Sequence, residues 1–256
     1  MEKKKPLILI TNDDGYQAKG IVSLTEALEG LGEIVVFAPD DHRSGMSSAI
    51  GASHPVRCSL NKQDEDIRYY TCNGTPVDCV KLALDQILER KPDLVVSGIN
   101  HGSNAGISVI YSGTMGAAIE GCIANIPSFG ISLDDFVPDA DFSQCARVAR
   151  RVAEKILYGE GLPNGVCLNI NVPKGEVKGL RVAKQTAGKW VNEYEKKTDE
   201  AGGDVYYMTG NLENWEKEND STDEWALANG YAAVVPIKID MTAYGYMDEL
   251  KERLLK

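Results

Sequence analysis

Leu7-Ile8-Leu9-Ile10-Thr11-Asn12-Asp13-Asp14-Gly15 joins a short apolar run to two adjacent carboxylates and a glycine. An apolar run that turn-forming residues end at once is typical of a strand buried on both faces, as in a parallel sheet. Residues 21–31 then show helical spacing, and a second apolar run over 34–38 ends at Pro39. This order of strand, helix and strand predicts a βαβ unit.

The same alternation continues downstream. Further strands are expected near residues 94–97, 129–133 and 166–172, helices near 76–88, 115–124 and 146–157, and a hairpin over 55–60 and 68–72. Strands that alternate with helices predict an α/β fold with a doubly wound, mostly parallel sheet.

The last third of the chain has a different pattern. Residues 187–224 carry many charges and little apolar periodicity, and the alternating residues 206–208 and 231–239 indicate extended arms. The end of the chain fits a short amphipathic helix over 247–255. We therefore expect a boundary near residue 180, between a core over 1–180 and a C-terminal arm region over 181–256 that completes it.

The composition limits the kinds of partner. The chain has 256 residues and a formal net charge of −11, which disfavours binding to a nucleic-acid polymer. A small anionic ligand would need a cation or a helix N-terminus to offset this charge locally. Six cysteines without a C-x-x-C pair indicate reduced thiols in a cytoplasmic protein. The N-terminal apolar run is too short for a signal sequence or a membrane span.

Asp13 and Asp14 follow directly after the first predicted strand. In open α/β sheets, ligands bind in the crevice at the carboxyl ends of the strands. Two unpaired neighbouring carboxylates repel each other, and a divalent cation such as Mg²⁺ or Mn²⁺ would remove that repulsion. Asp-Asp-Gly is also ordinary turn chemistry, so the pair alone does not decide between a metal site and a turn.

Three further polar stretches follow predicted strands or precede a predicted helix. They are Asp40-Asp41-His42-Arg43-Ser44-Gly45, Ser97-Gly98-Ile99-Asn100-His101-Gly102-Ser103-Asn104-Ala105-Gly106 and Tyr111-Ser112-Gly113-Thr114. Glycines let a backbone approach a ligand closely, and a helix N-terminus binds anions through its free N–H groups. Each stretch also has a plain structural interpretation: the first as a polar loop, the second as a flexible loop and the third as a helix N-cap. His101 is a weaker candidate, for which a structural or solvent-facing role is favoured.

Several common catalytic signatures are absent from the sequence. It contains no G-x-x-x-x-G-K-[ST] phosphate loop, no G-x-G-x-x-G after the first strand and no G-x-S-x-G nucleophile elbow. The three histidines lack metal-ligand spacing, which disfavours a zinc hydrolase.

Taken together, these segments resemble the SurE family, the survival-protein 5′/3′-nucleotidases. The resemblance covers nearly the whole chain and rests on the joint order of several motifs. These are Ile8-Leu9-Ile10-Thr11-Asn12-Asp13-Asp14-Gly15-Tyr16, Ala38-Pro39-Asp40, Arg43-Ser44-Gly45, Asn73-Gly74-Thr75-Pro76-Val77-Asp78, Ser97-Gly98-Ile99-Asn100-His101-Gly102, Tyr111-Ser112-Gly113-Thr114, Thr222-Asp223-Glu224 and Gly230-Tyr231. The resemblance implies a Rossmann-like catalytic core and a C-terminal arm that swaps between subunits to make a homodimer or homotetramer.

Members of this family hydrolyse nucleoside monophosphates with a divalent metal, and some trim short polyphosphate. The resemblance thus implies a phosphatase of nucleoside 5′- and 3′-monophosphates with Mg²⁺ or Mn²⁺ as its cofactor. Carried over by motif, the metal ligands are Asp13, Asp14, Ser44 and Asn100, of which Asp13, Asp14 and Asn100 are the catalytic residues. The phosphate contacts carried over in the same way are Asn12, Gly45, Asn104, Ser112, Gly113 and Thr114.

Two other functions stay open. A nucleotide sensor would use the anion-binding segment 112–114 without a metal and without turnover. A structural oligomer built by the arms would explain residues 187–224, but not the clustered polar loops. The chain also departs from common family patterns at His101 and Ser103, which bears on substrate preference.

Overall fold

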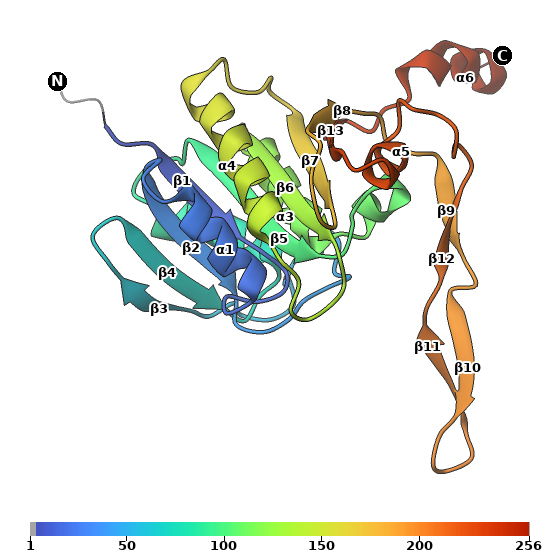
Figure 1. Ribbon diagram of the computed structural model, residues 1–256, viewed down its shortest axis with the longest axis horizontal. Coiled ribbons are helices and arrows are strands. Elements are labelled where there is room, and N and C mark those ends of the chain that lie inside the picture. Colours follow the sequence, from blue (N-terminus) through green and yellow to red (C-terminus); the bar gives the residue numbers. More distant parts are fainter. Residues whose placement is uncertain (1–3, 256) are drawn as a thin grey trace.

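The computed structural model describes residues 4–255, which form an α/β fold around a nine-stranded sheet (Figure 1). The strand order is β3-β4-β2-β1-β5-β6-β7-β13-β8. Its strands are β1 (Leu7–Thr11), β2 (Glu33–Pro39), β3 (Cys58–Gln63), β4 (Ile67–Cys72), β5 (Leu94–His101), β6 (Ser128–Asp134), β7 (Val166–Pro173), β8 (Leu180–Val182) and β13 (Ala232–Lys238). The six neighbouring strands β4, β2, β1, β5, β6 and β7 run parallel to one another. Strand β3 runs antiparallel to its neighbour β4, and β13 runs antiparallel to its neighbour β7. The predicted mostly parallel sheet and the predicted hairpin are confirmed.

Helices cover both faces of the sheet because the central strands are apolar at consecutive positions. Ile8 and Ile10 belong to the core cluster that includes α1 and α4, whereas Leu7 and Leu9 belong to the cluster that includes α2 and α3. The helices are α1 (Lys19–Leu28), α2 (Pro76–Leu82), α3 (Gly113–Ile123), α4 (Ser143–Tyr158), α5 (Asp223–Ala228) and α6 (Met247–Leu254), with a π-helical turn over Ala83–Ile87 and 3₁₀ turns over Gly106–Ile110 and Tyr244–Tyr246. The sheet is therefore doubly wound, as the sequence predicts.

An arm leaves the body of the molecule near α5 (Figure 1). Its base pairs β9 (Gly188–Val191) with β12 (Asn211–Asn214), and its tip is the hairpin of β10 (Tyr194–Thr198) and β11 (Asp204–Met208). The prediction of an extended arm around residues 206–208 is confirmed.

The prediction of an arm over residues 231–239 is wrong. This segment contains β13, which pairs with both β7 and β8 inside the central sheet. Its first residues, Ala232 to Val235, are buried. Alternation alone cannot separate a core strand from an extended arm, because the strand's partner β7 lies far away in the sequence.

The cysteines are free thiols, as predicted: five are buried and Cys58 is exposed. Over residues 4–255, every helix is too short or too polar to cross a membrane.

Candidate active site

The predicted site residues gather at the carboxyl ends of the parallel strands. Asp13 and Asp14 follow β1 directly, the loop with Ser44 follows β2, and Asn100 lies near the end of β5, which pairs with β1. A cavity of about 530 Å³ opens at this edge of the sheet. The predicted residues that line it are Asp13, Ser44, Gly45, Asn100, Asn104 and Ser112.

Asp13 is the buried centre of this edge, with an exposed fraction of 3%. Its Oδ1 accepts a 2.6 Å hydrogen bond from the Thr114 hydroxyl at the start of α3. Gly113 sits so close that a Cβ there would lie 3.0 Å from Asp13 Oδ2. The pKa of Asp13 is raised to about 6, because burial and, more weakly, the charge of Asp14 outweigh the Thr114 hydrogen bond, which lowers it. The ionised form of Asp13 is therefore disfavoured by its surroundings.

Asp14 lies beside this pocket and is held by groups from two other loops. The His101 backbone N–H donates to Asp14 Oδ2 at 3.4 Å, and His42 Nδ1 lies 3.4 Å from Asp14 Oδ1. The Arg43 N–H donates to the Asp13 carbonyl at 2.7 Å. The loops after β1, β2 and β5 are thereby tied together around the paired carboxylates.

The predicted phosphate contacts differ in what their side chains do. The Thr114 hydroxyl donates to Asp13, and Ser112 Oγ accepts from the Met115 N–H as the N-cap of α3. Asn104 Nδ2 donates to Ser132 Oγ at 2.9 Å. Asn12 Nδ2 donates to the Gly15 carbonyl, but its Oδ1 is buried with no hydrogen-bond partner. The backbone at the start of α3, rather than its hydroxyls, is thus available to an anion.

Sequence reasoning missed one whole wall of the cavity. The arm contributes Trp190, Glu193, Met208 and Thr209, and the loop after β6 contributes Phe136. Phe136 is 75% exposed and Met208 is 73% exposed. The only available signal was the presence of large apolar residues in otherwise polar segments, which does not indicate where those segments fold. The cavity therefore has a polar side on the sheet, and an opposite side where the arm and the loop after β6 contribute the large apolar residues.

The donor set of this edge fits a hard divalent cation. Two carboxylates, the Ser44 hydroxyl and the Asn100 amide are oxygen ligands of the kind that Mg²⁺ and Mn²⁺ prefer. Asn100 Nδ2 donates to the Gly102 carbonyl at 2.7 Å, which leaves the amide oxygen as the ligand atom. Within residues 4–255 no three His, Cys, Asp or Glu side chains are grouped to hold a metal. A cation here would therefore depend on the neutral oxygens as well as on the two aspartates.

A second acidic group, Glu224 at the start of α5, gives a pH-dependent prediction. Burial, then the charges of Asp223 and Asp134, raises the Glu224 pKa from 4.5 to about 7. Between these values the folded chain binds more protons than the unfolded chain, so this group lowers stability as pH rises through the window. Glu224→Gln should therefore stabilise the fold above pH 7. We expect the free energy of unfolding to rise by about 2 kcal/mol, after allowance for solvent screening, and the melting temperature to rise by a few degrees.

The comparison of thermal unfolding at pH 8 and at pH 4.5 checks this prediction. The gain should nearly vanish at pH 4.5, where the folded carboxyl is neutral and the unfolded carboxyl is only half ionised. Glu218→Gln, at an exposed position of the same segment, is the matched control and should change little at either pH. An equal gain at both pH values would contradict the assignment.

Comparison with known proteins gives consistent matches over the chain. The family described as "Survival protein SurE" matches residues 8–192. The 5′-nucleotidase SurE of Phocaeicola vulgatus is 50% identical over 252 residues, and that of Bacteroides fragilis is 51% identical over 252 residues, with 98% of each chain covered in both cases. The crystal structure of the SurE protein from Aquifex aeolicus superposes with a TM-score of 0.82 at 39% identity, covering 97% of this chain and 99% of that chain.

Proposed function

This chain belongs to the SurE family, and from that membership we propose a divalent-metal-dependent phosphatase of nucleoside 5′- and 3′-monophosphates. The observation that carries the proposal is the convergence of Asp13, Ser44 and Asn100 on one cavity at the carboxyl edge of the sheet. The name 5′-nucleotidase of the relatives supports the 5′ reaction. Short polyphosphate, as a further substrate, would use the same phosphate contacts. The free thiols accord with a cytoplasmic location.

The cation, Mg²⁺ or Mn²⁺, would be held by the carboxylates of Asp13 and Asp14, the Ser44 hydroxyl and the Asn100 amide oxygen. When bound, it supplies positive charge that polarises a phosphoryl oxygen and stabilises the charge that develops during phosphoryl transfer. Thr114 and the backbone of Arg43 fix Asp13 from two sides. These contacts hold the carboxylate in place before any ligand arrives.

The N-terminus of α3 would meet the phosphate. The first N–H groups of a helix have no intrahelical acceptor, and they carry a positive partial charge. Gly113 places this backbone directly beside Asp13, since no side chain intervenes. Ser112 caps the same turn through the Met115 N–H, so the Gly113 and Thr114 N–H groups remain for an anion. Gly45, Asn12 and Asn104 would complete the phosphate site.

The apolar wall would receive the nucleoside. Aromatic faces favour stacking of planar groups, and ligand cavities are usually apolar with a few polar groups that fix orientation. Trp190 from the arm and Tyr111 before α3 provide aromatic faces in this cavity, and Met208 from the arm adds apolar surface. The division into a polar and an apolar side suits a nucleoside monophosphate better than free phosphate.

Release of phosphate from a panel of nucleoside monophosphates in the presence of Mn²⁺ tests this proposal. We expect catalytic turnover, with many phosphates released per chain. Nucleotide binding at one equivalent per chain without phosphate release would instead indicate a sensor. Neither binding nor release would reject a nucleotide site altogether.

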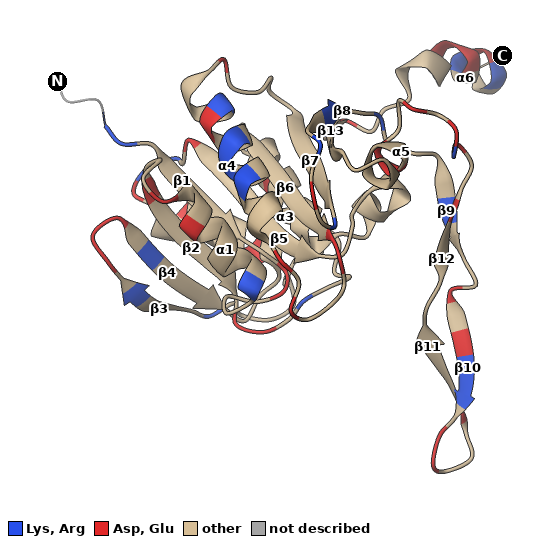
Figure 2. Ribbon diagram, viewed as in Figure 1, with Lys and Arg blue, Asp and Glu red and all other residues tan. Residues whose placement is uncertain are grey.

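We also propose that the arm joins copies of this chain into a homodimer or homotetramer. An isolated two-stranded hairpin is marginally stable in water, and contiguous exposed apolar residues mark interaction surfaces. Tyr194, Tyr206 and Tyr207 at the arm tip are each more than half exposed. Strand β10 carries charges of both signs, whereas β11 is uncharged after Asp204 (Figure 2). A tip of this composition needs a partner surface.

Replacing residues 194–208 with an Asn-Gly turn should reduce the size of the oligomer. The Thr209 N–H donates to the Glu193 carbonyl at 2.8 Å, so the shortened chain can close there without strain. Light scattering coupled to size-exclusion chromatography measures the mass. The matched control is Tyr158→Ser, which removes an exposed aromatic from the body. An unchanged oligomer in the shortened chain would reject a role for the arm tip.

A further inference from the structure

Asp223, at the start of α5, is fully buried and holds two distant segments together. Its Oδ2 accepts a 2.8 Å hydrogen bond from the Gly106 N–H. Its Oδ1 accepts from the Thr186 N–H at 2.9 Å and from the Thr186 hydroxyl at 2.6 Å. The Glu224 N–H also donates to Oδ1 at 2.9 Å. Each carboxylate oxygen is thus occupied by donors from a different part of the chain.

The first of these segments is the loop that carries Asn104 into the cavity. Gly106 ends this loop and begins the 3₁₀ turn that leads to Ser112. At the other side of the loop, Asn171 Oδ1 on β7 accepts from the Asn104 N–H at 2.7 Å, and Asn169 Nδ2 donates to the Asn104 carbonyl at 2.8 Å. The polar wall of the cavity is therefore anchored by β7 on one side and by Asp223 on the other.

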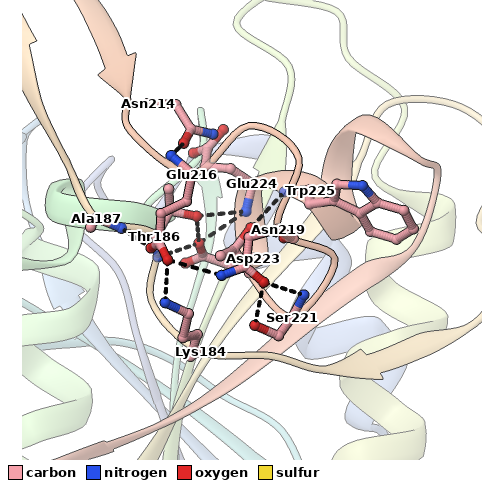
Figure 3. Close-up of polar contacts among 11 residues, drawn as sticks. Lys184, Thr186, Ala187, Asn214, Glu216, Asn219, Ser221, Asp223, Glu224 and Trp225 are labelled. Carbon is pink, nitrogen blue, oxygen red and sulfur yellow. Dashed lines mark hydrogen bonds and ion pairs between the residues drawn. The ribbon is translucent and has the colours of Figure 1, made fainter.

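The second segment is the base of the arm, which Figure 3 shows around Thr186 and Asp223. Thr186 lies just before β9, the strand that brings Trp190 to the cavity. The contact is direct, because a Cβ on Gly106 would lie 3.6 Å from both the Thr186 carbonyl and Leu212 Cδ2 of the opposite arm strand. The apolar wall is therefore anchored at the same carboxylate as the polar wall.

Glu216 fastens the arm base a second time, near Asp223 but with different partners (Figure 3). Its carboxylate accepts from the Lys184 ammonium at 2.5 Å, from the Ala187 N–H at 2.8 Å and from the Asn219 amide at 2.9 Å. These bonds join the two strands of the arm to each other. They do not reach the cavity loop, so Asp223 alone in this cluster joins the arm to that loop.

We propose that Asp223 is a positioning residue that sets the gap between the loop that carries Asn104 and the apolar wall on the arm, and thereby determines how tightly a nucleoside is held. The inference rests on the proposed function, since the gap matters only for a ligand that spans both walls. Asp223 touches no ligand itself. A substrate with a phosphate but no nucleoside would depend on the sheet side of the cavity and would be indifferent to the gap.

The variant Asp223→Asn tests this role because it keeps the size of the side chain. An amide has one acceptor oxygen, so its NH₂ must face either the Gly106 N–H or the Thr186 donors, and that link breaks. We expect the dissociation constant and KM for a nucleoside 5′-monophosphate to rise at least about tenfold, with kcat within about threefold. For glycerol 2-phosphate, which has no planar group to stack against the arm, kcat/KM should change by less than about threefold.

Two further variants complete the design. Glu224→Gln removes the neighbouring carboxylate, which accepts no hydrogen bond from the loop or the arm, and should leave both substrates unchanged. Thr186→Val removes one donor on the arm side and leaves Asp223 intact, so it should shift KM in the same direction by a smaller factor. It also provides the test if Asp223→Asn does not fold.

The outcomes separate this inference from the proposed function. No phosphate release by the unchanged chain would reject the phosphatase, whereas the dissociation constants would still test the gap. Nucleotide affinity unchanged in Asp223→Asn and Thr186→Val would overturn the positioning role. An equal loss with both substrates would also overturn it, because it would indicate general damage to the site.

Discussion

Replacing Asp13 with Asn is expected to lower phosphate release by on the order of 10²-fold or more while the chain stays folded. The amide can still accept the Thr114 hydrogen bond, so the local structure should survive. The negative charge that would hold the cation is lost. Burial and the Asp14 charge already disfavour ionised Asp13, so its neutralisation should not destabilise the metal-free fold. Asp14→Asn should have a comparable effect on turnover.

Steady-state phosphate release and thermal unfolding, measured on the same preparations, check this prediction. Asp41→Asn is the matched control, because Asp41 is an exposed aspartate of the neighbouring loop and its Oδ1 accepts only the His42 N–H. It should keep nearly full activity. Full turnover in Asp13→Asn would refute the assignment of the paired carboxylates.

Removal of divalent cations should abolish activity to a similar extent. The cavity offers oxygen donors but no lysine or arginine among its described lining residues, so the chain's own side chains supply little positive charge for a phosphoryl group. A Lewis-acidic cation contributes several kcal/mol to charge stabilisation, which corresponds to on the order of 10²-fold or more in rate. Chelation followed by desalting should therefore leave a folded protein that releases almost no phosphate.

Re-addition of single metals to the chelated chain is the control. Mg²⁺ or Mn²⁺ should restore turnover, whereas Na⁺ at equal ionic strength should not. Restoration must come without refolding, which a far-ultraviolet circular dichroism spectrum unchanged by chelation would show. Undiminished turnover after exhaustive chelation would contradict the metal-dependent account.

The central sheet could be predicted because its strands are locally distinctive. The run from Leu7 to Ile10 is apolar on both faces, and this requires a helix layer on each side. The alternation in residues 231–239 predicts an arm wrongly, because this segment is a core strand whose partner β7 lies far away in the sequence. The pairing of β13 is a property of the whole chain, so the pattern within the segment could not predict it.

The polar half of the site could also be predicted, because the carboxyl ends of neighbouring parallel strands meet at one edge. That rule brings together Asp13, Ser44 and Asn100 without knowledge of any distance. It could not predict that the Thr114 hydroxyl serves Asp13, nor that Trp190 and Met208 form a wall. The arm owes its direction to buried hydrogen bonds such as those of Asp223, and these leave no periodic trace in the sequence.

If one hard cation binds between the paired carboxylates, crystals soaked in Mn²⁺ should show an anomalous diffraction peak in contact with carboxylate oxygens of both Asp13 and Asp14. The peak should disappear in crystals of Asp13→Asn. A peak located away from this edge of the sheet, or an unchanged peak in the variant, would rule out this cation site.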